Sequence, residues 1–348
     1  MQMMDTYRVE ELAVLFREAR EIGIVTHTHP DGDAMGSTLA LYHFLSEKMG
    51  KKAYPVIPDS CPSSLDFIVP EGVVADAGKD SAGVSRRLSS CDLIVCLDLN
   101  TFSRTAVLES TLRESSVPKV LIDHHLNPDR DCFKLVFSDT EVSSTCELLY
   151  HILMHFPGIS DASELPAGTA AALMTGMTTD TNNFANSVFP STLAMASSLL
   201  AAGVDRDGIV ANLYNEYREN RVRAMGYILS ELLHITDDGV AYFVFRREDW
   251  KRFGLEEGET EGFVNLPLSI GRVKISIFMK EDDGFFRVSI RSKKGVSANR
   301  LAAAYFNGGG HECASGGRLY FPGDISSRGR AEKYIEEVAA RFLQNKNE

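Results

Sequence analysis

The chain has 348 residues, of which 44% are hydrophobic and 24% charged, a composition typical of a globular protein with roughly two domains. Its formal net charge of -12 opposes the binding of long duplex nucleic acid but permits a short phosphorylated substrate. No apolar run reaches the length of about 18 residues that a membrane span needs, and residues 1–20 lack the pattern of a signal peptide. The six cysteines form no C-x-x-C pair, so we expect free thiols in a reducing cytoplasm and no cysteine zinc site.

The first part of the chain alternates predicted strands with predicted helices, which favours an α/β fold with a parallel sheet. Apolar runs predict strands over residues 22–26, 53–57, 92–97, 119–122 and 133–137. Helical spacing predicts helices over residues 4–21, 37–49, 102–114, 143–156, 166–177 and 191–202. The run DLIVCL at 92–97 is apolar throughout, which suits a strand buried on both faces.

The pattern changes in the last third of the chain. Residues 205–235 form one or two charged helices, which we interpret as a connector. The elements predicted after it are strands at 240–245, 273–280, 285–291 and 317–321, and helices at 297–306 and 328–343. The chain is therefore predicted to have a larger parallel-sheet α/β domain (1–204), a helical linker (205–236) and a smaller α/β domain (237–348).

Chemically active side chains gather directly after the first predicted strand. His27, Asp31 and Asp33 stand in the short stretch HTHPDGD. In an open parallel sheet, ligands bind outside the carboxyl ends of the strands. Imidazole and carboxylate together suit a divalent metal ion. The alternative is a polar turn in which Asp and Gly serve only the backbone geometry.

Two further strands and one helix end in the same residue types. Asp98 follows the strand at 92–97, Asp123-His124-His125 ends the strand at 119–122, and Asp180 follows a helix of small residues. Carboxylates at the ends of neighbouring parallel strands converge. Each one alone is more simply explained as a helix cap or a solvated strand end, but a cap does not need two adjacent histidines.

The resulting ligand set is too large for one ion with open positions. It consists of His27, Asp31, Asp33, Asp98, His124 and Asp180. Six such ligands suit two ions about 3.5–4 Å apart with one bridging carboxylate. Four carboxylates and two imidazoles favour Mn²⁺, with Mg²⁺ or another divalent ion as the alternative. Such a pair of ions activates water and stabilises charge on a phosphate, which predicts hydrolysis of phosphoesters.

The blocks H-x-x-x-D-x-D, a strand-end Asp, D-H-H and a later Asp resemble the four motifs of the DHH phosphoesterases. The resemblance implies that His27 and Asp31 hold one ion and that Asp98 bridges to a second. The second ion would be held by Asp33, His124 and Asp180. His125 would contact the scissile phosphate, and Asp123 would orient a histidine. His29 has no counterpart among the family's ligands and is left out of the set.

The last third of the chain resembles the DHHA1 substrate-binding domain through Gly308-Gly309-Gly310-His311. Consecutive glycines let backbone N–H groups approach a phosphate, and the histidine adds a donor. Arg291 shares one face of its predicted strand with Arg287 and Ser289 and would clamp a phosphate with two hydrogen bonds. The alternative for this face is a solvated surface with ordinary salt bridges.

The resemblance extends from about residue 22 to residue 343 and is strongest to small two-domain members of the family. It implies hydrolysis of short oligoribonucleotides (nanoRNA) to mononucleotides, and of 3′-phosphoadenosine 5′-phosphate to AMP. Arg104, in the stretch Ser103-Arg104-Thr105, would meet the substrate. Related members often carry Gly and Arg after the fourth motif, where this chain has Asn-Asn-Phe-Ala-Asn at 182–186, so substrate contacts from that loop stay open.

Three other functions remain as alternatives. One is a phosphodiesterase for linear or cyclic dinucleotides. Another is an inorganic pyrophosphatase, which the GGGH signature disfavours, and the last is a binding or editing module, which the complete ligand set disfavours. The expected partners are short single-stranded RNA or nucleotides, not long duplexes or membranes. The oligomeric state is open, with a homodimer among the alternatives.

Overall fold

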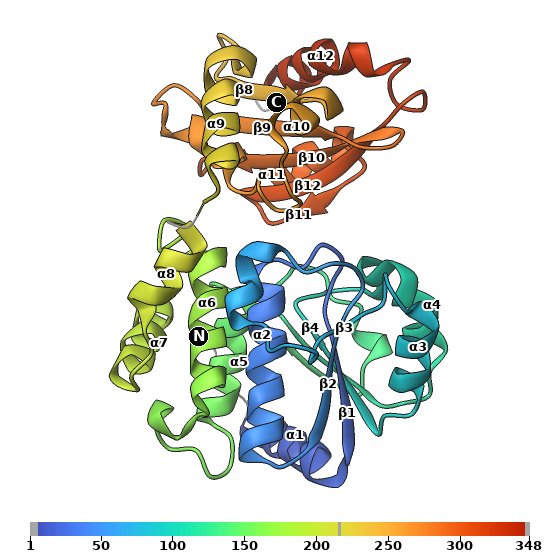
Figure 1. Cartoon of the computed structure of the whole chain (residues 1–348), viewed down its shortest axis with the longest axis vertical. Coiled ribbons are helices and arrows are strands. Elements are labelled where there is room, and N and C mark those ends of the chain that lie inside the picture. The colour runs from blue at the N-terminus through green and yellow to red at the C-terminus, as the bar shows by residue number, and fades with distance from the viewer. Residues whose placement is uncertain (1–5, 215–216, 345–348) are drawn as a thin grey trace. The chain divides into compact units, whose positions relative to one another are not determined.

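The computed structural model describes residues 6–214 and 217–344. They form two compact units, which separate after residue 216 (Figure 1). Helix α8 (Arg206–Tyr214) belongs to the first unit and helix α9 (Glu219–Tyr227) to the second. The beginning of the helix predicted at 4–21, and residues 215–216 of the predicted connector, lie outside the described residues.

In its described residues, the first unit contains one parallel sheet of six strands in the order β3-β2-β1-β4-β5-β6. The strands are β1 (Glu21–Val25), β2 (Lys52–Ile57), β3 (Ala75–Asp76), β4 (Leu93–Leu97), β5 (Lys119–Asp123) and β6 (Leu135–Ser138). The chain runs outward from β1 to β3 and then returns to the other side of β1 for β4 to β6. The neighbouring pair β1 and β4 is therefore the topological switch point, beside which ligands bind in open α/β sheets.

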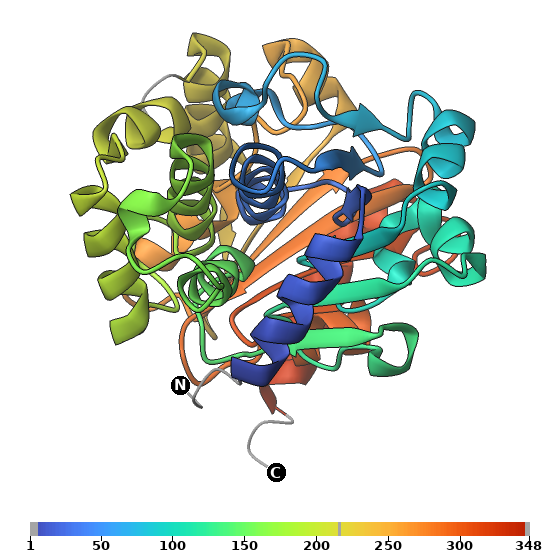
Figure 2. The same ribbon diagram turned by 90° about the horizontal axis from the view of Figure 1, so that it is seen from below.

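Helices cover both faces of this sheet, as an all-parallel sheet requires (Figure 2). One face packs against α1 (Thr6–Glu18), α2 (Gly32–His43) with its π-helical extension η1 (Phe44–Lys48), α5 (Thr145–Met154) and α6 (Ala167–Asp180). The other face packs against α3 (Ser81–Ser89), the 3₁₀ segment η3 (Phe102–Leu108) and α4 (Glu109–Glu114). Helix α7 (Pro190–Ala201) packs against α5 and α6, and α8 packs against α6. This arrangement confirms the predicted α/β class.

Helices α2 and α6 approach each other closely because Gly36 has no side chain. A Cβ at Gly36 would lie 2.7 Å from the carbonyl oxygen of Ala172 and 2.9 Å from the backbone nitrogen of Gly176. Real Cβ atoms essentially never come that near, so only glycine fits without a shift of one helix. The close packing brings the end of α6 beside the start of α2.

The helix that follows β1 begins earlier than the predicted start at residue 37. Helix α2 starts at Gly32 because Asp31 caps it, accepting hydrogen bonds from the backbone nitrogens of Asp33 and Ala34. The helix predicted at 102–114 is also different: it consists of the 3₁₀ segment η3, which is kinked at Ala106 with φ 42°, and the short helix α4. Helix α3, strand β3 and the 3₁₀ segments η2 (Ser63–Ile68), η4 (Arg130–Cys132) and η5 (Ala162–Glu164) were not predicted.

The second unit has a mixed sheet, with six strands among its described residues in the order β11-β12-β10-β9-β8-β7. The strands are β7 (His234–Ile235), β8 (Val240–Phe245), β9 (Ile275–Glu281), β10 (Phe285–Ser292), β11 (Gly309–Gly310) and β12 (Ala314–Tyr320). Only β8 and β9 pair in parallel among these.

Helices lie on both faces of the second sheet. On one face pack α11 (Ala298–Tyr305) and α12 (Ala331–Gln344), the latter preceded by the 3₁₀ turn η8 (Arg328–Arg330). On the other pack α9, η6 (Ile228–Leu232), α10 (Arg247–Phe253) and η7 (Phe263–Ser269). Across 6–214 and 217–344, no helix is both long and apolar enough to cross a membrane.

Candidate active site at the carboxyl edge of the first sheet

The predicted side chains of the first unit meet at the carboxyl edge of its sheet, beside the switch point. The six predicted metal ligands among them form two sets of three residues in which one ligand atom from each residue lies within 4.8 Å of the others. One set is His27, Asp31 and Asp98, and the other is Asp33, His124 and Asp180. Because β1, β4 and β5 are neighbours, their ends bring His27, Asp98 and His124 together.

Asp98 stands between the two sets. Its Oδ2 lies 3.3 Å from Nε2 of His27, and its Oδ1 lies 3.5 Å from Nε2 of His124. Nε2 of His124 is also 3.8 Å from Oδ2 of Asp33 and 3.6 Å from Oδ2 of Asp180. One carboxylate therefore presents one oxygen to each set.

The backbone of Asp98 is itself unusual. It has φ 59°, in the left-handed region that a residue with a side chain seldom adopts. Its N–H donates to the carbonyl of Ile122 at 3.1 Å, which ties the residue to β5. Strained backbone of this kind persists at functional sites, where the surrounding structure holds it.

Hydrogen bonds fix the orientation of the histidine rings. Nδ1 of His27 lies 2.8 Å from the carbonyl oxygen of Thr28, which can only accept, so Nδ1 carries a proton and Nε2 is the ring nitrogen that faces Asp98. Nδ1 of His125 lies 2.7 Å from Oδ1 of Asp123. Nε2 of His125 lies 3.1 Å from the guanidinium of Arg104, which can only donate. His125 is thus held between an acceptor and a donor.

Burial and mutual repulsion make this cluster unfavourable for free carboxylates. Asp33 is 1% exposed, and burial, followed by the charges of Asp98, Asp180 and Asp31, raises its pKa well above the usual value. Burial also opposes the ionisation of Asp98, but the hydrogen bond with His27 and the nearby imidazoles outweigh it and hold the pKa of Asp98 well below its usual range. A cation placed among these oxygens would relieve the repulsion.

The remaining candidates have simpler surroundings. Asp31 is exposed and caps α2 through Oδ1, and it also belongs to the first set. Asp180 is the last residue of α6. His29 lies outside both sets, and its ring Nδ1 is 2.7 Å from Oδ2 of Asp59.

The substrate-binding residues predicted near the C-terminus lie in the second unit. Arg291 is on β10, part-buried, and its guanidinium donates to the carbonyl of Ile290 at 3.0 Å. Gly309 and Gly310 form β11, an exposed edge strand that pairs with β12, which in turn pairs with β10. A Cβ at Gly308 would overlap the carbonyl of Gly316, so glycine is required there. The N–H of His311 donates to the carbonyl of Ala314 at 2.8 Å.

The helix predicted at 143–156 is α5, but sequence reasoning missed the contacts that the start of this helix makes in the site. The backbone nitrogens of Thr145 and Cys146 donate to Asp33 at 2.6 and 2.9 Å, and the hydroxyl of Thr145 donates to Asp98 at 2.9 Å. The signal was present, because Ser144 and Glu147 have the S-x-x-E spacing of a helix start. That spacing predicts a helix start, but not what the helix start contacts.

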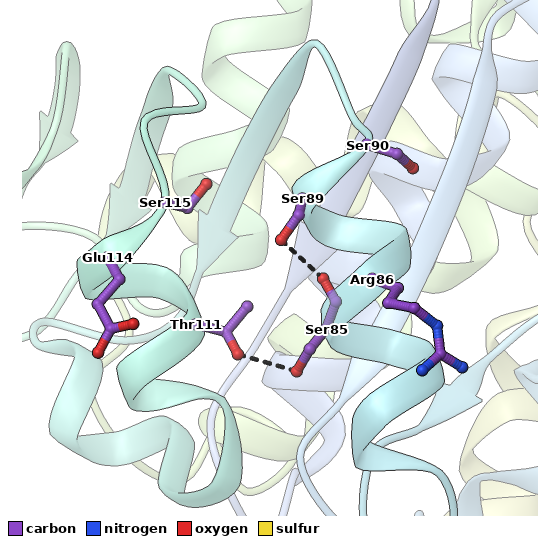
Figure 3. Close-up of a pocket in the computed structure, with 7 residues that line it drawn as sticks. All are labelled: Ser85, Arg86, Ser89, Ser90, Thr111, Glu114 and Ser115. Carbon is purple, nitrogen blue, oxygen red and sulfur yellow. Dashed lines mark hydrogen bonds between the residues drawn. The ribbon is translucent and has the colours of Figure 1, made fainter.

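A separate polar pocket lies between α3 and α4 (Figure 3). The hydroxyls of Ser85 and Thr111 join the two helices across it at 2.8 Å, and the hydroxyl of Ser89 donates to the carbonyl of Ser85. It is lined by Ser85, Arg86, Ser89, Ser90, Thr111, Glu114 and Ser115. This pocket has one carboxylate, Glu114, and no imidazole among its lining residues, whereas the strand edge brings several carboxylates and imidazoles together, so the strand-edge cluster is the candidate active site.

Clusters of carboxylates and imidazoles at the carboxyl edge of a parallel sheet are the kind of site that a metal-dependent hydrolase of phosphoesters uses. The chain matches the family model "DHH family, N-terminal domain" over residues 21–177 and the "DHHA1 domain" model over residues 237–340. It therefore belongs to the DHH family of phosphoesterases and carries a C-terminal DHHA1 domain, as its motifs indicated.

Individual relatives are similar over most of the chain. It is 32% identical to the bifunctional oligoribonuclease and PAP phosphatase NrnA of Thermus thermophilus, over 86% of this chain and 84% of the relative. It is 28% identical to NrnA of Bacillus subtilis, over 85% and 89%. A crystal structure of an exopolyphosphatase-related protein from Bacteroides fragilis is 33% identical, with a TM-score of 0.90 and 100% of both chains covered.

Proposed function

We propose that the protein is a two-metal phosphodiesterase and phosphatase that hydrolyses short oligoribonucleotides to mononucleotides and 3′-phosphoadenosine 5′-phosphate to AMP. The observation that carries the proposal is Asp98, whose two oxygens face His27 and His124 in two different ligand sets. Relatives that bear the name of this activity match more than four fifths of the chain.

The donor set fits divalent ions. His27, Asp31 and Asp98 would hold one ion, and Asp33, His124 and Asp180 would hold a second that shares Asp98. Carboxylate oxygens combined with imidazole nitrogens favour Mn²⁺ over Mg²⁺, which is seldom held by imidazole. When bound, the ions supply an activated water and take up negative charge on the phosphate.

The scissile phosphate would be contacted by His125 and Arg104, and Asp123 would orient the ring of His125. The carboxylate of Asp123 holds Nδ1 of His125 and also accepts the backbone N–H of His125 at 3.1 Å, which fixes the ring. The guanidinium of Arg104 lies against His125 and the backbone carbonyl of Asp98. A guanidinium next to a fixed imidazole suits an anionic substrate, because the guanidinium offers donors to phosphate oxygens.

The second unit would bind the rest of the substrate. Arg291 and the segment Gly308-Gly309-Gly310-His311 lie on neighbouring parts of one sheet, separated by β12. Backbone N–H groups and a guanidinium suit a terminal phosphate. We retain 1–204, 205–236 and 237–348 as the catalytic domain, linker and substrate-binding domain of this proposal.

The test uses the purified full chain and three substrates. They are 5′-labelled diadenylate, 3′-phosphoadenosine 5′-phosphate and cyclic di-adenylate, each with Mn²⁺, with Mg²⁺ and with a chelator. We expect mononucleotide from diadenylate and AMP from the bisphosphate, fastest with Mn²⁺ and abolished by the chelator. Faster hydrolysis of cyclic di-adenylate than of its linear product would replace the proposed substrate, and turnover undiminished by the chelator would contradict the metal mechanism.

A further inference from the structure

The start of helix α5 contacts both central carboxylates of the candidate active site. Oδ2 of Asp33 accepts from the backbone nitrogen of Thr145 and Oδ1 from that of Cys146, and Oδ1 of Asp98 accepts from the hydroxyl of Thr145. All four residues are buried. The helix start thus holds both oxygens of Asp33 and one oxygen of Asp98.

The helix does not need the Thr145 hydroxyl for its own capping. That task belongs to Ser144, whose Oγ accepts the backbone N–H of Glu147 at 3.0 Å. Thr145 is the first helical residue and is fully buried. Its hydroxyl proton is directed to Asp98, so the placement of this side chain is explained by the active site and not by the helix.

The start of α5 is itself anchored to a neighbouring helix. The carboxylate of Glu147 accepts from the backbone nitrogen of Ser143 at 2.9 Å, from the Ser143 hydroxyl at 2.5 Å and from the Thr192 hydroxyl at 2.6 Å. Thr192 lies on α7. These contacts fix the start of α5, which carries Thr145, so the Thr145 hydroxyl donates to Asp98 from a defined direction.

We propose that Thr145 is a positioning residue of the metal centre, and that its hydroxyl sets the orientation of Asp98 while the start of α5 sets that of Asp33. Partners of ligating carboxylates orient the ligands, and their loss typically costs about 10–100-fold in metal affinity or activity. Asp98 is the carboxylate whose orientation matters most, because its two oxygens face different ligand sets. This inference rests on the proposed function, since it requires Asp33 and Asp98 to be metal ligands.

The experiment compares three variants of the full chain. Thr145→Val replaces the hydroxyl with a methyl group and keeps the backbone N–H on Asp33, whereas Thr145→Ser keeps a hydroxyl. Thr169→Val is the matched control, because Thr169 is equally buried and its hydroxyl donates to the carbonyl of Ala40, outside the site. Calorimetry measures Mn²⁺ binding, and circular dichroism checks folding. The kinetic constants kcat and KM are measured on diadenylate at saturating Mn²⁺.

We expect Thr145→Val to bind Mn²⁺ about 10–100-fold more weakly, with kcat reduced more than KM is raised. Thr145→Ser should recover binding to within a few-fold of the wild type, and Thr169→Val should bind Mn²⁺ as the wild type does. If Thr145→Val fails to fold, Thr145→Ala takes its place, because alanine is well tolerated in a helix.

Two results would overturn the inference. One is wild-type Mn²⁺ affinity and kcat in a folded variant without the hydroxyl, and the other is an equal loss in Thr145→Ser. Failure of the proposed function would be visible in a different measurement, because the wild-type protein would then bind no Mn²⁺. That result would overturn both the proposed function and this inference.

Discussion

The two units use charged residues in opposite ways. In the first unit, Asp33 and Asp98 are 1% and 2% exposed and lie among other carboxylates, so negative charge is concentrated where water is excluded. In the second unit, Arg287 lies 3.0 Å from Glu257 and 3.2 Å from Asp282, and these side chains keep about a third to a half of their surface in water. The first arrangement is unbalanced and buried, whereas the second is balanced and solvated.

The difference shows which charge clusters point to a ligand. Burying like charges raises the free energy of the folded state. A fold retains such a cluster only when another interaction, such as a bound cation, offsets this unfavourable free energy. Exposed opposite charges satisfy one another and need no further partner. A cluster of the first kind is therefore evidence for a site, and a cluster of the second kind is evidence only for a solvated surface.

The largest effect should follow from loss of the shared carboxylate. Asp98→Asn keeps the shape of the side chain but removes its charge, and in the proposed function the ions held by this carboxylate would contribute several kcal/mol of charge stabilisation. At 1.36 kcal/mol for each factor of ten, we expect kcat/KM on diadenylate to fall at least about a thousandfold. The fall in kcat/KM is measured from initial rates at saturating Mn²⁺, and circular dichroism confirms that the variant is folded.

The same substitution in the second unit is the control. Asp282→Asn removes a charge of the balanced cluster, in which Asp282 faces Arg287 and Arg247. It should leave kcat/KM within about twofold of the wild type, since Asp282 lies outside both ligand sets. A surface substitution of this kind also changes the free energy of unfolding by roughly 0.5 kcal/mol at most. Similar losses in both variants would remove the distinction between the two clusters.

The convergence of the strand-end carboxylates and imidazoles was predictable from the sequence because their positions follow from local pattern and simple topology. The runs DLIVCL and KVLI are apolar throughout, which indicates buried parallel strands, and each is followed at once by Asp98 or Asp123. Strands of this kind become neighbours with their carboxyl ends at one edge, so convergence follows without knowledge of the packing.

Other parts of the site depend on packing between distant segments. Thr145 reaches Asp98 across 47 residues of chain, and only the packing of α5 against the sheet and α2 makes that contact. The start of α2 was placed too late, at residue 37, because D-G-D has the composition of a turn, while Asp31 in fact begins the helix by capping it. Local pattern predicted which carboxylates and imidazoles come together, but not the residues that donate hydrogen bonds to them.

A smaller effect is expected on the free energy of unfolding when the pH is lowered, because Glu147 is a buried carboxylate that accepts hydrogen bonds from the protein. Burial opposes its ionisation, but hydrogen bonds from His151, Ser143, Ser191 and Thr192 outweigh this and lower its pKa from 4.5 to about 2. Because the folded pKa is below the unfolded one, the stabilisation is present above pH 4.5 and is lost as the pH falls towards 2. The loss should be at most about 3 kcal/mol, at 1.36 kcal/mol for each pKa unit.

Urea unfolding between pH 5 and pH 2.5 measures this contribution, with Glu147→Gln as the comparison. The variant should be less stable than the wild type at pH 5, and the difference should shrink steadily as the pH falls. A difference that stays constant across this range would mean that the charge of Glu147 contributes nothing and that only its shape matters.

The smallest effect should come from the balanced cluster. Glu257 accepts from Lys280 and Arg287 at 3.0 Å, yet about half of its side chain is in water. Exposed ion pairs contribute less than about 1 kcal/mol, because water screens the charges and two long side chains must be held in place. Glu257→Gln should therefore shift the urea midpoint only slightly, and added salt should shrink even that shift. A loss comparable to that of Glu147→Gln at pH 5 would mean that the second unit, too, depends on a charge cluster for its stability.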